Sequence, residues 1–489
     1  MMHHRAIPCD LHRRGLIMGI GNENTRIYTV FVSSGIQHLE ASHIKPTTNE
    51  EVLHKLRSEC DGIDFVVGSS PHEIENLKQD FDGVLIFGGL GNYAMALTGL
   101  PTIVVYNFPE FLHIPYGLLL SKGKVLTTCL DRANTCSPSI SSSMFEDLVG
   151  KIRLIQALKK MKESRILSVT NSPYVTTIRG DLSSLYDGDI RQLSPEEHNE
   201  IFLNAVGESL GTKVTKIGIE EVSSDEQIQN IDDKKAEEIA KMWIAEAKGM
   251  KDTIESEVVK SAKMYLAMQI LMEKYEATVI ATHIRSLIKN PTPEDMMWPS
   301  MGNSELQKRG IVGCCQAHIN VVLTHMLAQY AFGRSSMMGD FTTEPFNDVS
   351  IIMHCGAPWN PRGLDDRVPY IIRDHAERQV SGHSKPGGGA CSEVLYPANE
   401  PATIWRIDVQ GKLIQAHTGM TVDPYSLYKD FDYLMCRTKL VIKTDAGKVQ
   451  RYVEPDKRGV HRTGTLGDHR EKIKDLATLI GFEVIEEEK

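Results

Sequence analysis

The chain has 489 residues, of which 41% are hydrophobic and 24% charged, and its formal net charge is −10. These values are ordinary for a soluble globular protein of several domains, and the absence of a basic stripe argues against nucleic acid as the main partner. No apolar run reaches the roughly 20 residues of a membrane span. Nine cysteines without a Cys-x-x-Cys pair argue against a disulfide framework. We therefore expect a cytoplasmic protein that acts on a small molecule, without nucleic-acid or membrane contacts.

In the first two thirds of the chain, short apolar runs alternate with amphipathic segments, which is typical of βαβ units and a parallel sheet. Predicted strands are Leu16–Ile20, Phe65–Val67, Val84–Phe87, Ile103–Tyr106, Val214–Ile219 and Ala277–Thr282. Predicted helices are Asn49–Glu59, Phe145–Lys162 and a segment within Asp252–Tyr275. The alternation restarts at Ile166, so we predict two Rossmann-like α/β domains, residues 1–165 and 166–335.

The last third of the chain is rich in predicted strands. Two hairpins are predicted around Gly-containing turns. Their strands are Thr403–Val409 with Lys412–Ala416, and Lys439–Thr444 with Lys448–Val453. A helix at His469–Ile480 and a strand at Phe482–Ile485 close the chain. We predict a β-rich C-terminal domain with a terminal helix, residues 336–489.

Two glycine-rich segments have simpler interpretations than ligand binding. Gly89, Gly91 and Ala94 form a G-x-G-x-x-A pattern, but the pattern comes late in its domain, so a turn before a helix is favoured over a nucleotide site. The segment Ser381–Val394 contains three consecutive glycines without the Gly-Lys-Ser/Thr ending of a P-loop. A surface loop is the default there, and a lid or phosphate loop is the alternative.

The stretch 310–358 has the layout of a functional site. Gln316 and His318 precede an amphipathic helix predicted over Ala317–Phe332. A Met-Met-Gly-Asp turn then places Asp340 before a hydrophobic strand that ends at His354. An Asp in a turn usually makes local hydrogen bonds, so ordinary turn chemistry and a ligand role both remain open.

Other side chains make a metal site a second interpretation. Glu344 follows Asp340 closely, and the segment HRTGTLGDH near the C-terminus supplies further histidines. Oxygen ligands with one or two imidazoles suit Mn²⁺ or Mg²⁺ better than structural zinc. Two histidines seven apart, His318 and His325, are by themselves more often solvated or structural than ligands.

His283 and Arg285 follow the predicted strand Ala277–Thr282. In an open parallel sheet the carboxyl ends of the strands face the ligand crevice. These two side chains are therefore candidates to contact an anionic or polyol substrate, with ordinary loop polarity as the equally weighted alternative.

Taken together, these segments resemble the superfamily of L-fucose and L-arabinose isomerases. The family pattern is G-I-x-x-x-C-E-x-D, a helix, a turn with an acidic residue, and a strand ending in His-Cys. Here the corresponding segments are GIVGCCQAH, the helix, MMGDFTTEP and IIMHCGAP. Gln316 and Asp340 are separated by 24 positions, similar to the family's two catalytic carboxylates. His461, six residues before Gly467, is similar to the family's metal-binding histidine.

The resemblance implies a fold, a reaction and an assembly. The fold has two α/β domains and a β-rich, barrel-like C-terminal domain. The reaction is that of a metal-dependent aldose–ketose isomerase, an intramolecular oxidoreductase that works through a cis-enediol. The partner is a small-molecule sugar, and the chain assembles into a homo-oligomer, a hexamer or a trimer.

The resemblance also implies roles for individual residues. A divalent ion, usually Mn²⁺ with Mg²⁺ or another divalent metal as the alternative, is held by Asp340, His461 and, more weakly, Gln316. Acid–base catalysis falls to Asp340 or Glu344, with Gln316 and His318 beside them. The substrate-binding candidates are His354, His283 and Arg285.

Gln316 departs from the family pattern, because it stands where the family has a catalytic Glu. An amide can offer its carbonyl oxygen to a metal but cannot accept a proton as a base. Three alternatives follow: proton transfer by Asp340, Glu344 or His318; a different reaction on the same scaffold, such as lysis or hydrolysis of a sugar derivative; or sugar binding without catalysis. A nucleotide-dependent enzyme that uses Gly89 and Gly91 is a further alternative.

Overall fold

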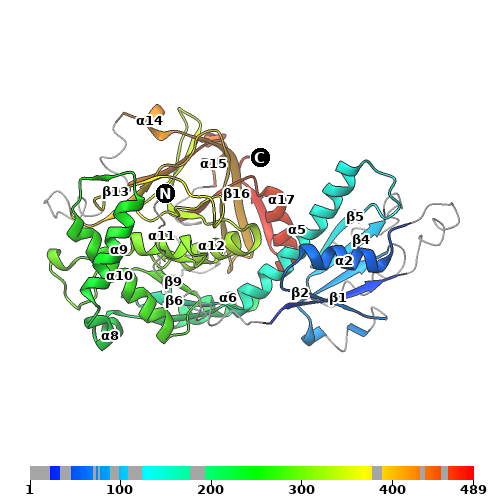
Figure 1. Ribbon diagram of the computed structural model, residues 1–489, viewed down its shortest axis with the longest axis horizontal. Helices are drawn as coiled ribbons and strands as arrows, with labels where there is room; N and C mark the ends of the chain where they lie inside the picture. The colour runs from blue at the N-terminus through cyan, green and yellow to red at the C-terminus, as the bar shows by residue number, and fades with distance from the viewer. Residues whose placement is uncertain are drawn as a thin grey trace, which may run out of the picture.

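The computed structural model describes residues 23–32, 46–69, 73–74, 78–88, 99–107, 124–176, 193–376, 388–429, 436–452 and 461–489. The described residues form a mixed α/β structure with two parallel sheets, a β-rich sheet and a small three-stranded sheet. The first parallel sheet, with α2 and α5, lies at one end of the molecule, and the remaining sheets lie together at the other (Figure 1). The predicted α/β class and the β-rich last third are therefore confirmed.

The first sheet has five parallel strands in the order β2-β1-β3-β4-β5. These are β1 (Thr25–Phe31), β2 (Ile63–Val67), β3 (Gly83–Phe87), β4 (Thr102–Asn107) and β5 (Val125–Leu130), with helices α2 (Asn49–Glu59), η3 (Lys78–Asp80) and α5 (Pro138–Glu163). β3 is buried along its whole length, which explains its continuous apolar run. The predicted strand Leu16–Ile20 and the motif at Gly89, Gly91 and Ala94 lie outside the described residues.

The second sheet has four parallel strands in the order β10-β9-β6-β7. Its strands are β6 (Arg165–Val169), β7 (Lys213–Ile217), β9 (Val279–Thr282) and β10 (Gly313–Cys315). The helices between them are α6 (Pro195–Leu210), α7 (Ile219–Ser223), α8 (Glu226–Gln229), α9 (Asp233–Glu246), α10 (Glu255–Lys274), η6 (Pro293–Asp295) and α11 (Ser300–Lys308). The chain leaves β6 for β7 on one side and returns to β9 on the other. The switch point of this sheet, where ligands bind in such folds, therefore lies between β6 and β9.

The helix α12 (Ile319–Phe332) is enclosed rather than amphipathic. Asn320, Thr324 and His325, on its polar side, are as buried as its apolar residues. The reason is tertiary: the Thr324 hydroxyl and the Asn320 amide accept hydrogen bonds from two backbone N–H groups at the end of β15, at 3.0 and 3.4 Å. The prediction of an amphipathic helix is corrected on this point, because the polar face meets a sheet and not water.

The β-rich sheet has seven strands in the order β15-β18-β11-β12-β17-β16-β19, and β15 also pairs with β16. Its strands are β11 (Met337–Glu344), β12 (Val349–His354), β15 (Pro401–Asp408), β16 (Leu413–Val422), β17 (Thr438–Lys443), β18 (His461–Leu466) and β19 (Glu483–Glu486). The accompanying helices are α14 (Pro424–Leu427), α15 (Ala446–Gln450) and α17 (Arg470–Ile480). The small sheet contains β8 (Met250–Lys251), β13 (Tyr370–Arg373) and β14 (Cys391–Val394). Because β15 pairs with both β18 and β16, the strands β15, β18, β11, β12, β17 and β16 form a closed ring of pairings.

Two predicted elements of this region are wrong. Asp340 lies inside β11 and not in a turn, because β11 pairs with β12 on one side and with β18 on the other. The second predicted hairpin does not form in the described residues: the Asp445 side chain accepts a hydrogen bond from Lys448 N at 3.0 Å and starts the short helix α15. The first hairpin, β15 with β16, is confirmed.

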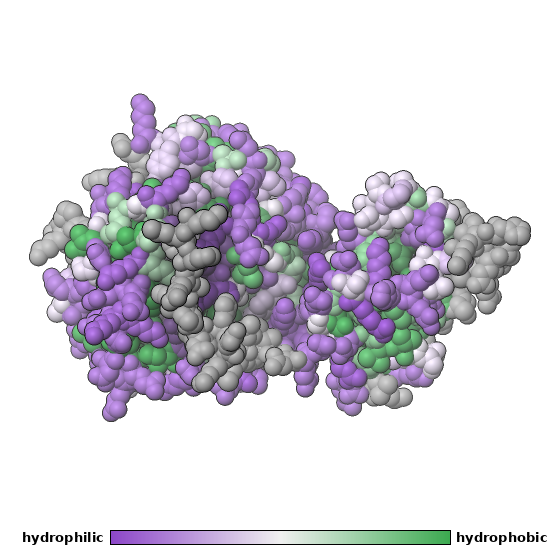
Figure 2. Space-filling model, in the orientation of Figure 1, coloured by the Kyte–Doolittle hydropathy of each residue, from purple (hydrophilic) through white to green (hydrophobic). Residues whose placement is uncertain are grey.

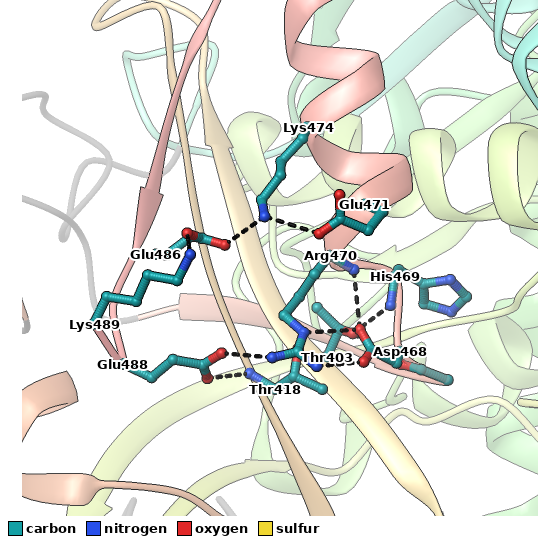
Figure 3. A network of polar contacts seen from close by, with 11 residues as sticks. Thr403, Thr418, Asp468, His469, Arg470, Glu471, Lys474, Glu486, Glu488 and Lys489 are labelled. Atoms are coloured by element: carbon teal, nitrogen blue, oxygen red, sulfur yellow. Dashed lines mark hydrogen bonds and ion pairs between the residues drawn. The ribbon is translucent and has the colours of Figure 1, made fainter. Parts of the chain in front are cut away.

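The C-terminal residues are fastened to the terminal helix and to β16 by polar contacts (Figure 3). The Lys474 ammonium pairs with Glu471 at 2.9 Å and with Glu486 at 2.8 Å. The Glu488 carboxylate accepts a hydrogen bond from Thr418 N at 2.8 Å and pairs with Arg470 at 3.3 Å. The chain end is thereby held against the sheet that carries His461.

The viewed face of the molecule is mostly hydrophilic, with apolar patches that are separate from one another (Figure 2). No helix in the described part of the chain has the length and apolar character needed to cross a membrane.

Candidate functional site

Asp340 and His461 face each other across the paired strands β11 and β18. The distance from His461 Nε2 to Asp340 Oδ1 is 3.2 Å, yet neither ring nitrogen of His461 makes a hydrogen bond with a described residue. Two ligands that bind one divalent ion at right angles, each about 2.1 Å from it, stand about 3 Å apart. The approach of these two donor atoms therefore fits a shared cation.

Gln316 and His318 join this pair from the start of α12. His318 Nε2 lies 2.8 Å from Gln316 Oε1, and the His318 ring stacks on the His461 ring with centroids 3.8 Å apart. Gln316 has a backbone φ of +81°, a left-handed conformation that is unfavourable for a residue with a side chain and is concentrated at functional sites. The structure thus brings together Gln316, His318, Asp340 and His461, four of the residues selected from the sequence.

The surroundings of His461 favour its neutral form. Burial lowers the pKa of His461 well below its usual value, and the nearby charges of His318, His354, Arg406 and His283 lower it further. A neutral imidazole is the form that binds metal ions. Arg406 in β15 is only 2% exposed and was not selected from the sequence. The feature of the sequence that could have indicated Arg406 is its position as a charged residue within a mostly apolar strand.

Two predicted substrate-binding histidines lie close to this group, as their influence on His461 indicates. His354 ends β12 and is buried, and its Nδ1 accepts a hydrogen bond from Gly356 N at 3.1 Å. His283 follows β9, and its N–H donates to the Val169 carbonyl at 2.8 Å.

Glu344 is not part of the group. It lies four residues from Asp340 along the same strand, which corresponds to about 13 Å. Its carboxylate accepts hydrogen bonds from the Phe346 and Asn347 backbone and from the Tyr428 hydroxyl. These contacts give Glu344 a structural role in the turn between β11 and β12, and they leave Asp340 as the carboxylate beside His461.

A pocket of about 540 Å³ opens over the carboxyl ends of β6, β7 and β9. His283 and Arg285 both line it, together with Lys216 and Lys289. The Arg285 guanidinium lies over the Trp298 ring, 5.2 Å from its centroid. Arg285, the last of the residues selected from the sequence, therefore lines this pocket. His283 lines the same pocket and also lies close to His461.

A divalent cation at this place would meet few protein donor atoms. Across the described ranges, no three His, Cys, Asp or Glu side chains are arranged to hold a metal ion among them. The group offers an imidazole at His461, a carboxylate at Asp340 and an amide oxygen at Gln316, which would give a cation two stronger donors and one weaker donor. Mn²⁺ and Mg²⁺ accept such sparse protein ligation, with water or substrate oxygens completing the shell, whereas structural zinc requires four protein ligands.

Comparison of the sequence with models of known protein families and with curated proteins finds no match.

Proposed function

We propose that this protein is a metal-dependent carbohydrate enzyme that interconverts an aldose and a ketose. The observation that carries the proposal is the 3.2 Å approach of His461 Nε2 to Asp340 Oδ1 beside Gln316 and His318. These residues come from three distant segments, and the resemblance to sugar isomerases selects the same residues. A divalent ion, Mn²⁺ or Mg²⁺, would be held by Asp340, His461 and the Gln316 carbonyl oxygen, and when bound it supplies Lewis-acid polarisation of adjacent sugar oxygens.

The protein residues provide the proton transfer. Isomerisation needs a base that removes a proton from the carbon next to the carbonyl and returns it to the neighbouring carbon. Asp340 is the carboxylate in position for this role, and half of its side chain (49%) is exposed and so within reach of a substrate. His318 holds the Gln316 amide through its 2.8 Å contact and keeps the His461 ring in place by stacking.

The same proposal includes the domain division and the assembly. We assign two Rossmann-like domains, residues 1–165 and 166–335, and a barrel-like C-terminal domain, residues 336–489. The two parallel sheets and the ring of strand pairings support this assignment. A cytoplasmic homo-oligomer, trimeric or hexameric, completes the proposal on the strength of the resemblance.

Metal content and isotope exchange test the proposal. Purified protein dialysed against Mn²⁺ should retain the ion, and the Asp340→Ala and His461→Ala variants should lose it, as measured by mass spectrometry of metals. The Glu344→Gln variant is the matched control, because Glu344 lies outside the group and should leave metal content unchanged. Incubation of sugars in deuterated water should place label at C1 or C2. Equal metal content in wild type and Asp340→Ala would refute the site.

Gln316 favours a second candidate function, a relative of the isomerases that cleaves a sugar derivative or only binds it. The amide cannot act as the second base, and its loss of charge weakens the attraction for a divalent ion. Saturable sugar binding without turnover and without deuterium exchange would support the binding protein. Turnover without exchange would support a lyase or hydrolase.

A further inference from the structure

We propose that the ligand of this protein is a sugar that carries an anionic group, a phosphate or a carboxylate, and that this group binds in the pocket over β6, β7 and β9. For the reacting end of the sugar the inference rests on the proposed function. The sheet edge, the charges of the pocket and its dimensions support the anionic end.

Backbone hydrogen bonds place the pocket and the start of the histidine group on the same edge of the sheet. Gln316 N donates to the Thr282 carbonyl at 2.9 Å, which joins the end of β10 to the end of β9. His283 N donates to the Val169 carbonyl, which joins β9 to β6. Thr170 N donates to the Ile217 carbonyl at 3.0 Å, which joins β6 to β7. The carboxyl ends of all four strands therefore form one uninterrupted edge, with Gln316 at one end and the pocket over the rest.

The pocket carries an excess of positive charge. Its basic side chains are Lys216, Arg285 and Lys289, and the one acidic side chain among its lining residues is Glu220. Glu220 pairs with Lys289 at 3.2 Å, so these two charges offset each other. Three basic side chains against one acidic side chain give the lining a formal net charge of +2. Stacking on Trp298 orients the Arg285 guanidinium, whose planar fork of donors matches a carboxylate or phosphate.

The dimensions of the pocket suit part of a small ligand. A volume of about 540 Å³ lies within the range of small-molecule sites. Neighbouring strands are about 4.8 Å apart, so the pocket begins one strand spacing from Gln316. In this proposal, a sugar whose carbonyl end lies at Asp340 and His461 would extend past Gln316 and place its far end over β9 and β6.

The neutral amide of Gln316, at the position where the family pattern has a carboxylate, also favours an anionic ligand. A carboxylate at this position would add a negative charge beside the bound sugar, whereas the amide is neutral. An anionic substrate is therefore repelled less here than it would be by two carboxylates.

Calorimetric titration of the full-length protein tests the inference. The probes are inorganic phosphate, a neutral aldose, the same aldose with a terminal phosphate, and the corresponding uronic acid. We expect both or one of the anionic sugars to bind at least ten-fold more tightly than the neutral sugar, and the comparison of the two identifies the group. The Arg285→Gln and Lys216→Gln variants should each lose most of this advantage. Lys213→Gln is the matched control, since Lys213 is exposed at the amino end of the same strand as Lys216.

The outcomes separate this inference from the proposed isomerisation. Anion-selective binding that depends on Arg285 supports the inference even if no sugar is isomerised. Isomerisation of a neutral aldose with kcat/KM unchanged in Arg285→Gln would overturn the inference and leave the proposed function intact. Equal affinity for neutral and anionic sugars, or equal losses in Lys213→Gln and Lys216→Gln, would also overturn it.

Discussion

Arg462 and Glu487 form an ion pair of 3.3 Å in which both side chains are completely buried. The second carboxylate oxygen of Glu487 lies 2.7 Å from His417 Nδ1. Because side chains alternate along a strand, Arg462 lies on the opposite face of β18 from His461. The buried ion pair therefore fixes the strand that carries His461 by tying it to the C-terminal residues.

The Glu487→Gln substitution should destabilise the protein by about 3–5 kcal/mol, because it removes the carboxylate that pairs with the buried Arg462 charge. Urea unfolding monitored by circular dichroism measures this loss. The control is Glu471→Gln, whose side chain is 84% exposed and whose substitution should cost less than about 0.5 kcal/mol. Similar free energies of unfolding for the two variants would contradict the role of the pair.

The Gln316→Glu substitution should tighten Mn²⁺ binding by roughly ten-fold or more, because ligand charge is the main determinant of affinity for hard divalent cations. Titration with Mn²⁺ followed by electron paramagnetic resonance measures the dissociation constant. Gln450→Glu, at an exposed position of α15, adds the same charge away from the site and should leave the constant unchanged. If both variants behave alike, Gln316 is not beside the ion.

The Gly339→Ala substitution should destabilise the protein by about 1–3 kcal/mol, since an added methyl group would lie 2.5 Å from the Met353 carbonyl oxygen. Metal affinity should fall with it, because Asp340 is the next residue. Gly150→Ala is the control of opposite sign: apart from the adjacent backbone of its own helix, no described atom lies within 4 Å of the added group, and alanine favours the helix by about 0.5–1 kcal/mol. Thermal unfolding of both variants measures the difference.

Stability should fall below about pH 6.5, the pKa of histidine in the unfolded chain. Burial lowers the pKa of His325 to about 3 and the pKa of His469 to about 4. The folded form of each therefore stays neutral while the unfolded form takes up a proton, so stability is full above pH 6.5 and is lost as pH falls toward these values. Each residue should account for about 2 kcal/mol between pH 6.5 and 5.

Urea unfolding at several pH values, with wild type and His325→Gln, checks this contribution. The free energy of unfolding of the variant should depend less steeply on pH, because the contribution of one histidine is removed. His54→Gln, at an exposed position of α2, should keep the wild-type dependence. An unchanged slope in His325→Gln would contradict the assignment.

Periodicity along the chain was sufficient for the α/β class and for most helices, because both depend on local patterns. The helix Asn49–Glu59 has the predicted bounds, since Thr48 and Glu51 form a capping box that is visible in the sequence. The predicted strand Val84–Phe87 corresponds to β3, whose continuous apolar run reflects burial on both faces. The neighbourhood of Gln316, His318 and Asp340 was also visible as a cluster of polar residues around one helix.

Tertiary structure decided what local patterns cannot carry. Asp340 belongs to a strand because two distant strands pair with β11, and His461 reaches Asp340 through that same pairing. Glu344 is close to Asp340 in sequence, but the extended backbone of β11 separates the two side chains. Arg406 lies near His461 although the two residues belong to strands that are far apart in the sequence. The sequence by itself determined which segments form helices or strands and which residues are candidates for metal binding or acid–base chemistry. Which of those residues share a site was decided by strand pairing between distant segments, since hydrogen-bond register depends on the whole sheet and not on the neighbouring residues.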